Sequence, residues 1–201
     1  MKVAIINGSP RENSQSEKVA NYLSKEYQKH GLDPSLISLK GNPFPLWDES
    51  IWSDDNWAGG VFKEASNILK ESDLIVVVCP EYNGLVPPSL QNFFLLAGKN
   101  ELGHKPALAV TVSAGRGGAY PVLLLRMSGY KNTRLAYMPD HLIVREATKV
   151  LNTPDPENPG DKFIREKIEY TIKVSKEYAK AFIGIRESGV VDFENHGNGM
   201  S

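Results

Sequence analysis

The chain opens with Lys2-Val3-Ala4-Ile5-Ile6-Asn7-Gly8-Ser9-Pro10-Arg11-Glu12-Asn13-Ser14, and this stretch decides its fold. Residues 3–6 are apolar without alternation, which predicts a strand buried on both faces, as in a parallel sheet. The Gly-Ser-Pro tripeptide that follows cannot continue the strand. A helical pattern begins near Ser14, which stands three residues before Glu17, the spacing of a capping box. The stretch therefore predicts a strand–loop–helix corner of an α/β protein.

The loop inside this corner has the composition of a phosphate site. It carries hydroxyls, one arginine and free backbone N–H groups beside the positive end of a helix. It is not a P-loop, because no G-K-[ST] follows, and Gly8 is its only glycine, which excludes the dinucleotide fingerprint G-x-G-x-x-G. The loop thus suits a single terminal phosphate. The alternative is that any such corner of an α/β protein collects Gly, Ser and Asn.

Composition restricts the class of protein. A chain of 201 residues fits one domain, with residues from about 185 to 201 as a C-terminal tail, and its 41% hydrophobic and 23% charged residues are ordinary for a globular protein. A net charge of -1 gives no electrostatic case for binding nucleic acid or a membrane surface. Cys79 is the only cysteine, so no disulfide framework is expected. Without a signal-peptide pattern or a membrane-spanning apolar run, we expect a cytoplasmic protein.

The remaining chain alternates between strand and helix patterns. Strands are predicted at 35–39, 74–79 and 107–112, and a fifth at either 135–138 or 141–144. Helices are predicted at 61–69, from Pro87 or Pro88 onward, from 119 to about 130, and at 161–183. Five alternations require a mostly parallel, doubly wound sheet with helices on both faces.

Residues 41–60 form a long connection that contains all three tryptophans, Trp47, Trp52 and Trp57. Connections of this length are usually functional or disordered, and so many aromatic residues argue against disorder. One interpretation is a cap over the sheet edge. The other is a lid or a subunit contact, favoured by the enrichment of aromatic residues at interface cores.

Three loops follow predicted strands at their carboxyl ends: 8–14, 80–87 and 113–118. In a doubly wound sheet the ligand crevice lies outside the carboxyl ends of the strands, where the strand order reverses. We therefore expect the three loops to converge on one site.

The first two loops carry a family resemblance. The segment P-E-Y-N-x-x-x-P-x-x-L-x-N from Pro80 to Asn92, with G-S-x-R-x-x-S from Gly8 to Ser14, resembles the NAD(P)H-dependent FMN reductases of the flavodoxin-like superfamily. This group includes quinone, azo-dye and chromate reductases. The resemblance covers roughly Lys2 to Asn132 and departs at Phe94, where many relatives carry Asp. It implies a flavodoxin-like fold with strand order 2-1-3-4-5.

The resemblance also implies a cofactor, FMN, and the residues that hold it. The resemblance implies that the first loop and the start of its helix bind the phosphate, and that the second and third loops bind the isoalloxazine ring. The implied cofactor-binding residues are Ser9, Arg11, Ser14, Gln15, Ser16, Pro80, Glu81, Tyr82, Asn83, Gly84, Ser113, Gly115, Arg116, Gly117 and Gly118. Arginine offers a fork of donors to phosphate, and small residues let the backbone approach a flat cofactor.

The implied activity is transfer of hydride from NADPH or NADH through FMN to a small-molecule acceptor such as a quinone, azo compound, free flavin or metal ion. The chemistry belongs to the flavin, so no catalytic side chain is assigned. The resemblance further implies a homodimer or homotetramer. The competing hypothesis is a flavodoxin-type electron carrier without its own NAD(P)H turnover, although flavodoxins tend to be strongly acidic and this chain is nearly neutral. A flavin-binding protein with a regulatory role and weak turnover is a third possibility.

Four residue types have more than one reading. Cys79 ends an apolar strand, which favours a core role over redox chemistry. Glu81 is either a general acid or a structural acceptor, and Arg116 either neutralises an anion at the site or is a solvated loop residue. The four histidines show no metal-ligand spacing, so no metal site is expected.

Overall fold

The computed structural model describes residues 1–52 and 60–197. Its sheet has five parallel strands in the order β2-β1-β3-β4-β5. The strands are β1 (Lys2–Asn7), β2 (Asp33–Ser38), β3 (Leu74–Pro80), β4 (Pro106–Val112) and β5 (Ala136–Val144). The flavodoxin-like fold and strand order expected from the sequence are confirmed.

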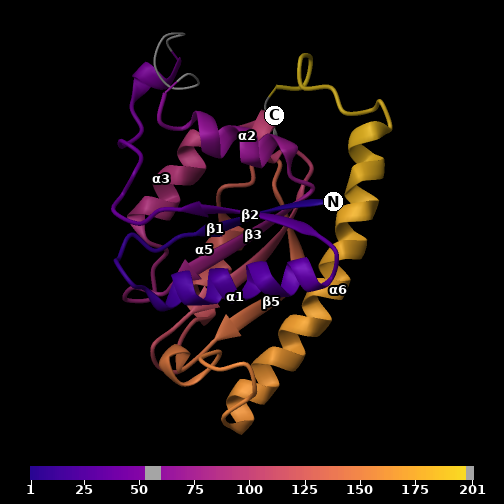
Figure 1. Cartoon of the computed structure of the whole chain (residues 1–201). Helices are drawn as coiled ribbons and strands as arrows, with labels where there is room; N and C mark the ends of the chain where they lie inside the picture. The colour runs from indigo at the N-terminus through magenta and orange to yellow at the C-terminus, as the bar shows by residue number, and fades with distance from the viewer. Residues whose placement is uncertain (53–59, 198–201) are drawn as a thin grey trace.

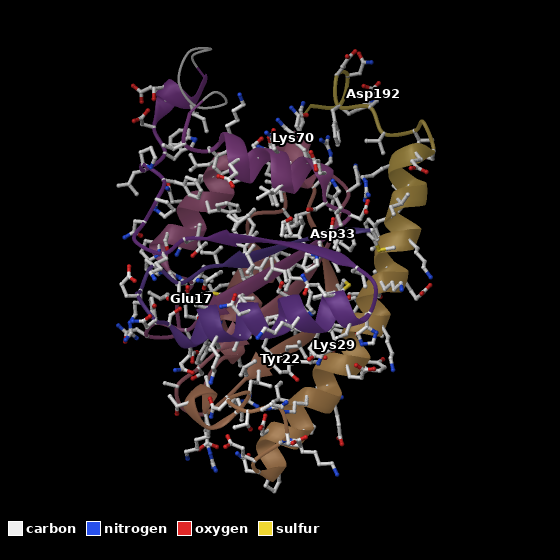
Figure 2. All side chains as sticks on the ribbon, in the orientation of Figure 1. Glu17, Tyr22, Lys29, Asp33, Lys70 and Asp192 are labelled. Atoms are coloured by element: carbon white, nitrogen blue, oxygen red, sulfur yellow. The ribbon has the colours of Figure 1, made fainter. Side chains whose placement is uncertain are left out.

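Helices cover both faces of this sheet (Figure 1). One face packs against α1 (Gln15–Lys29) and the long α6 (Pro159–Glu187). The other packs against α2 (Lys63–Glu71), α3 (Pro88–Leu96), α4 (Lys99–Leu102) and α5 (Ala119–Met127). Short 3₁₀ turns, η1 (Glu49–Trp52) and η2 (Ala147–Lys149), interrupt two of the connections. Figure 2 shows charged side chains such as Glu17, Lys29 and Asp33 on the outer surface of this arrangement.

The apolar runs seen in the sequence are the central strands. Residues 3–7 of β1 and all residues of β3 and β4 are buried, with successive side chains pointing to opposite layers. The edge strand β2 differs, since only Ile37 is buried in it and Pro34 lies within it. Proline is tolerated at a sheet edge because its missing N–H costs no ladder hydrogen bond there.

Strand β5 joins the two segments between which the sequence could not decide, since it contains all of 141–144 and all of 135–138 except Leu135. Ala107 of β4 pairs with Tyr137, whereas Ala109 pairs with His141, so residues 138–140 bulge opposite one residue of β4. Pro139 lies in this bulge, at the second edge of the sheet, where proline is expected. The bulge separates two apolar halves of one strand.

The chain after α6 returns to the amino ends of β4 and β5. The Phe193 ring stacks on His104 with centroids 5.8 Å apart, and the Arg134 guanidinium lies over the same ring. The expected fraying of residues 198–201 lies outside the described residues. None of the helices that the structure describes is long and apolar enough to cross a membrane.

Candidate functional site

Three loops meet at the carboxyl edge of the sheet, as expected for a doubly wound fold. The loops after β1 and β3 flank the point at which the strand order reverses, and the loop after β4 lies beside them. Because β3 lies between β1 and β4, its loop touches both of the others. The contacts described below join all three into one cradle.

The first loop is held tightly against its neighbours. The Gly8 N–H donates to Val78 O at 2.8 Å, and a side chain at Gly8 would place its Cβ 2.8 Å from Leu90 and 2.9 Å from the Val78 oxygen. Ser9 is fully buried, and its Oγ accepts from the Arg11 N–H at 3.3 Å. The position therefore requires glycine, and the loop curls back on the Ser9 hydroxyl.

Helix α1 begins directly behind this loop, with the predicted cap. The Ser14 Oγ accepts from the Glu17 N–H at 3.1 Å. Within the described part of the chain, the N–H groups of Gln15 and Ser16 have no acceptor, and the buried Gln15 Oε1 has no donor. These groups suit an anion that also carries hydroxyl groups, since a helix start favours negative charge.

Arg11 extends from the same loop into solvent. Its guanidinium makes no hydrogen bond among the described residues, while its backbone is anchored to Ser9. An exposed guanidinium beside free N–H donors can close over a phosphate.

The second loop makes a tight turn. Tyr82 and Leu85 exchange backbone hydrogen bonds of 3.1 and 2.8 Å, and Asn83 and Gly84 between them have φ of 51° and 78°. Positive φ at both central positions defines a type I′ turn, for which Asn-Gly is the preferred pair. The Asn-Gly pair of the motif is therefore explained by backbone geometry.

Glu81 and Tyr82 reach from this loop to opposite neighbours. The Gly118 N–H donates to Glu81 Oε2 at 2.7 Å, and the Tyr82 hydroxyl lies 3.0 Å from Ser9 Oγ. The geometry thus favours the structural-acceptor reading of Glu81 over the general-acid reading.

Residues that follow β5 donate hydrogen bonds to the third loop. The N–H groups of Glu146 and Ala147 donate to the carbonyls of Gly115 and Ser113, and Arg145 Nε donates to the carbonyls of Arg116 and Gly117. These bonds use the carbonyl side of the loop. The N–H groups of residues 114–117 find no acceptor in the described chain, which leaves them available to a ligand.

The sequence did not predict these hydrogen bonds to the third loop, nor the lysine that binds the segment from which they come. Lys18 Nζ donates to Ala147 O, Val150 O and Asn152 Oδ1 at 2.6–2.8 Å, which ties α1 to the segment after β5. Burial lowers the pKa of this amine. No local signal marks Lys18, because its partners lie about 130 residues away.

Cys79 and two of the histidines make contacts that belong to the packing of the fold. Cys79 is buried, and burial raises the pKa of its thiol to about 12, so it is not a reactive thiolate. His30 contacts Glu169 at 2.7 Å, and His104 stacks on Phe193. No cluster of side chains able to hold a metal ion occurs among residues 1–52 and 60–197.

The described part of the tryptophan-rich connection packs on the chain's own helix α3. Asn92 Nδ2 donates to Pro45 O at 2.9 Å, and its Oδ1 accepts from the Trp47 N–H at 2.8 Å. Phe44 packs against Phe93 in the same place. The side chain of Trp52 and all of Trp57, on which the expected subunit contact also rests, lie outside the described residues.

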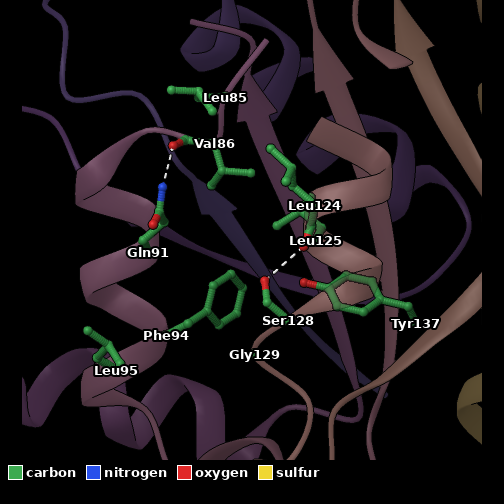
Figure 3. Close-up of a pocket in the computed structure, with 10 residues that line it drawn as sticks. All are labelled: Leu85, Val86, Gln91, Phe94, Leu95, Leu124, Leu125, Ser128, Gly129 and Tyr137. Atoms are coloured by element: carbon green, nitrogen blue, oxygen red, sulfur yellow. Dashed lines mark hydrogen bonds between the residues drawn. The ribbon is translucent and has the colours of Figure 1, made fainter. Parts of the chain in front are cut away.

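An apolar groove borders the second loop between α3 and α5 (Figure 3). Its volume is about 390 Å³, and Leu85 and Val86 form the end nearest the turn. Phe94 points into it from α3, and Tyr137 closes it from β5. Dashed lines in the figure mark two hydrogen bonds in the wall, from Gln91 Nε2 to Val86 O and from Ser128 Oγ to Leu124 O.

Comparison with known proteins gives a consistent result. The family model for NADPH-dependent FMN reductase matches residues 1–149. An NADPH azoreductase from a Bacillus species is 29% identical over 119 residues, and a quinone reductase from Pseudomonas putida is 32% identical over 128. Each match spans 59% of this chain and only 62% and 63% of the respective relative.

Solved structures agree on the fold. The flavoenzyme NAD(P)H:(acceptor) oxidoreductase from Paracoccus denitrificans superposes with a TM-score of 0.71 at 19% identity, over 90% of this chain and 98% of its own. A flavodoxin from the domain Archaea superposes with a TM-score of 0.53 at 14% identity, over 89% of this chain and 99% of its own.

Proposed function

This chain belongs to the NADPH-dependent FMN reductase family, and from that membership we propose that it is an FMN-dependent oxidoreductase. In this proposal it takes hydride from NADPH or NADH and passes electrons to a small-molecule acceptor of the quinone or azo class. The relatives' names support both acceptor classes.

The observation that carries the proposal is the cradle of three joined loops. It offers unpaired N–H donors at the start of α1 and along residues 114–117, within the described part of the chain. The buried, unpartnered Gln15 Oε1 adds an acceptor that a ligand hydroxyl would satisfy. These donors and this acceptor fit a flavin mononucleotide, which joins a phosphate to a ribityl chain and a flat ring.

The residues divide by the part of the cofactor that they would hold. Ser9, Arg11, Ser14 and Ser16 with the N–H groups of α1 would bind the phosphate. The second and third loops would hold the ring, with the N–H groups of 114–117 aimed where negative charge develops on reduction. FMN, when bound, supplies the hydride and electron chemistry, so no acid–base side chain is required.

A first test concerns the cofactor itself. Heat should release FMN from the purified protein, and chromatography should identify it. Recovery of FAD would contradict the proposal, because the first loop is built for one terminal phosphate.

A second test separates the reductase from an electron carrier. Under anaerobic conditions NADPH alone should bleach the yellow holoprotein, and menadione or an azo dye should restore the colour. A holoprotein that bleaches only when a separate reductase is added would instead be a flavodoxin-type carrier. NADH in place of NADPH measures the nicotinamide preference in the same experiment.

We further propose that the protein is a homodimer or homotetramer, joined through the face of α3 and α5. These two helices hold 18 residues, of which only Arg126 is charged. Leu95, which lines the groove of Figure 3, and Leu123 and Met127 of α5 are 57–74% exposed. Depletion of charge and exposure of large apolar side chains mark interface cores.

The location that we propose is a reducing cytoplasm. It rests on Cys79 being the only cysteine, which leaves no pair for a disulfide within one chain.

A further inference from the structure

The residues Glu81 and Tyr82 stand together at the end of the central strand β3, yet their side chains leave in opposite directions. Glu81 reaches the loop after β4, and Tyr82 reaches the loop after β1. Side chains alternate in an extended segment, and β3 lies between β1 and β4, so two consecutive residues can contact both neighbouring loops.

Glu81 determines where the third loop turns into α5. Its carboxylate accepts from the Gly118 N–H at 2.7 Å, while Thr111 Oγ1 donates to Gly118 O at 2.7 Å. Gly118 has φ of 99°, and a Cβ there would lie 2.4 Å from Ile143. A Cβ on the preceding residue, Gly117, would lie 2.0 Å from Glu81 Oε2. The loop therefore needs glycine at 117 because the Glu81 carboxylate occupies the space of a side chain, and at 118 because of Ile143 and the positive φ.

Tyr82 acts on the hydroxyl of Ser9. A serine oxygen accepts two hydrogen bonds and donates one. The Arg11 N–H takes one acceptor position of Ser9 Oγ, and the Tyr82 hydroxyl lies 3.0 Å away on another side. Because Ser9 is fully buried, these two contacts fix the first loop from its inner side and set where the exposed groups of the loop face an anion.

We infer that Glu81 and Tyr82 are positioning residues that act on the cofactor through other groups. Tyr82 fixes the first loop, which faces the phosphate, through the buried Ser9 hydroxyl, and Glu81 holds the N–H groups of the third loop toward the ring. The inference rests on the proposed function, since it needs FMN as the ligand of this site. Both residues of the Glu-Tyr pair therefore serve to place loops. Loss of the Tyr82 hydroxyl should weaken only ligands that carry the phosphate, whereas loss of the Glu81 carboxylate should weaken ligands with and without it.

The test compares two ligands that differ only in the phosphate. Apoprotein is titrated with FMN and with riboflavin, and quenching of flavin fluorescence reports each dissociation constant without any turnover. Tyr82→Phe should weaken FMN binding about tenfold and change riboflavin binding less than twofold. Tyr120→Phe is the matched control: it removes a phenol hydroxyl beside the same turn that has no hydrogen bond among the described residues, and both constants should stay unchanged.

Glu81 is tested by a double-mutant cycle with Gly117. Glu81→Ala removes the acceptor and Gly117→Ala displaces it, so each should weaken FMN and riboflavin alike, by about tenfold. Because both changes break one contact, the double variant should bind no more weakly than the worse single variant. Glu81→Gln keeps an acceptor oxygen and should bind within about threefold of wild type.

Three results would overturn the inference. They are equal losses of FMN and riboflavin in Tyr82→Phe, no loss of either ligand in that variant, and additive losses in the Glu81→Ala and Gly117→Ala cycle. The circular dichroism spectrum and melting temperature of each apoprotein show whether a variant has folded. If Glu81→Ala has not, Gly117→Ala carries the test, because it should weaken FMN and riboflavin alike. Failure of the wild-type protein to bind either flavin would instead contradict the proposed function.

Discussion

Arg11 is the residue whose role in the site depends most on its charge. Its backbone is fixed to Ser9, and its side chain is exposed in the loop that leads into α1. Arg11→Ala should therefore weaken FMN binding by roughly 1.5–3 kcal/mol, the size of a charge-assisted hydrogen bond, without affecting the fold. Fluorescence titration measures this loss.

The matched control is Lys25→Ala, which removes another exposed cation that lies farther along α1. It changes the net charge equally and should leave FMN affinity unchanged. Equal losses in the two variants would mean that Arg11 contributes only to the general field of the protein.

Gly8 is a residue where packing alone makes a prediction. A Cβ would lie 2.9 Å from the Val78 oxygen, a backbone atom that cannot turn aside. Gly8→Ala should lower the free energy of unfolding by about 1–3 kcal/mol through overpacking. Urea unfolding of the apoprotein measures it.

Gly184→Ala is the control, for which the free energy of unfolding should change in the opposite direction. The position is open and inside α6, so alanine should stabilise the chain by up to about 1 kcal/mol.

Among the elements, α2 depends on a lysine from outside it. Lys105, which precedes β4, is 5% exposed, and its amine donates to the carbonyls of Leu69 and Lys70 at the end of the helix. Lys105→Met keeps the apolar stem and leaves both carbonyls without this donor. We expect a loss of about 1–3 kcal/mol in the free energy of unfolding, measured in urea at pH 7.

The same lysine should make the free energy of unfolding depend on pH. Burial lowers its pKa to about 8 in the folded protein, against 10.5 for an ordinary lysine. Between these values the unfolded chain binds a proton that the folded chain has released, so the contribution of Lys105 to stability rises with pH. The difference in stability between wild type and Lys105→Met should therefore grow from pH 8 to pH 10.5. Taking the difference removes the opposite contribution of Cys79, whose pKa is raised by burial. A difference that stays constant over this range would contradict the lowered pKa.

At the scale of the whole molecule, the prediction concerns assembly. Light scattering should give wild type two or four times the mass of one chain. Leu123→Glu places a charge at a position that is 57% exposed on α5, where the fold tolerates it and an apolar interface does not. We expect this variant to shift toward monomer. Phe163→Glu, at 59% exposure on α6 across the sheet, should leave the mass unchanged.

The tryptophan-rich connection provides the competing interface. Because Asn92 ties Pro45 and Trp47 to α3 of the same chain, we expect Trp47→Ala to retain the oligomer. A monomeric Trp47→Ala beside an oligomeric Leu123→Glu would place the contact in this connection. A monomeric wild type would exclude both faces.

Much of the fold follows from local signals in the sequence. The unbroken apolar runs of β1, β3 and β4 indicated strands buried on both faces, and the Ser14 cap indicated where α1 begins, because both signals depend on neighbours only a few residues away. The position of three loops at strand carboxyl ends was enough to predict one site. The strand β5 was ambiguous because a bulge at Pro139 breaks its pattern, and only its register with β4 shows that the two halves are one strand.

The contacts inside the site were decided by tertiary structure. Glu81 and Gly118 are 37 residues apart, Ser9 and Tyr82 are 73 apart, and Lys18 lies 129 residues from Ala147. Nothing local distinguishes these partners from other polar residues of the chain. They meet because β3 lies between β1 and β4, and because α1 covers the face that the segment after β5 also reaches. Residue pattern determined which segments become strands and helices, whereas strand order determined which loops became neighbours, since a hydrogen bond depends on distance in space and is indifferent to distance along the chain.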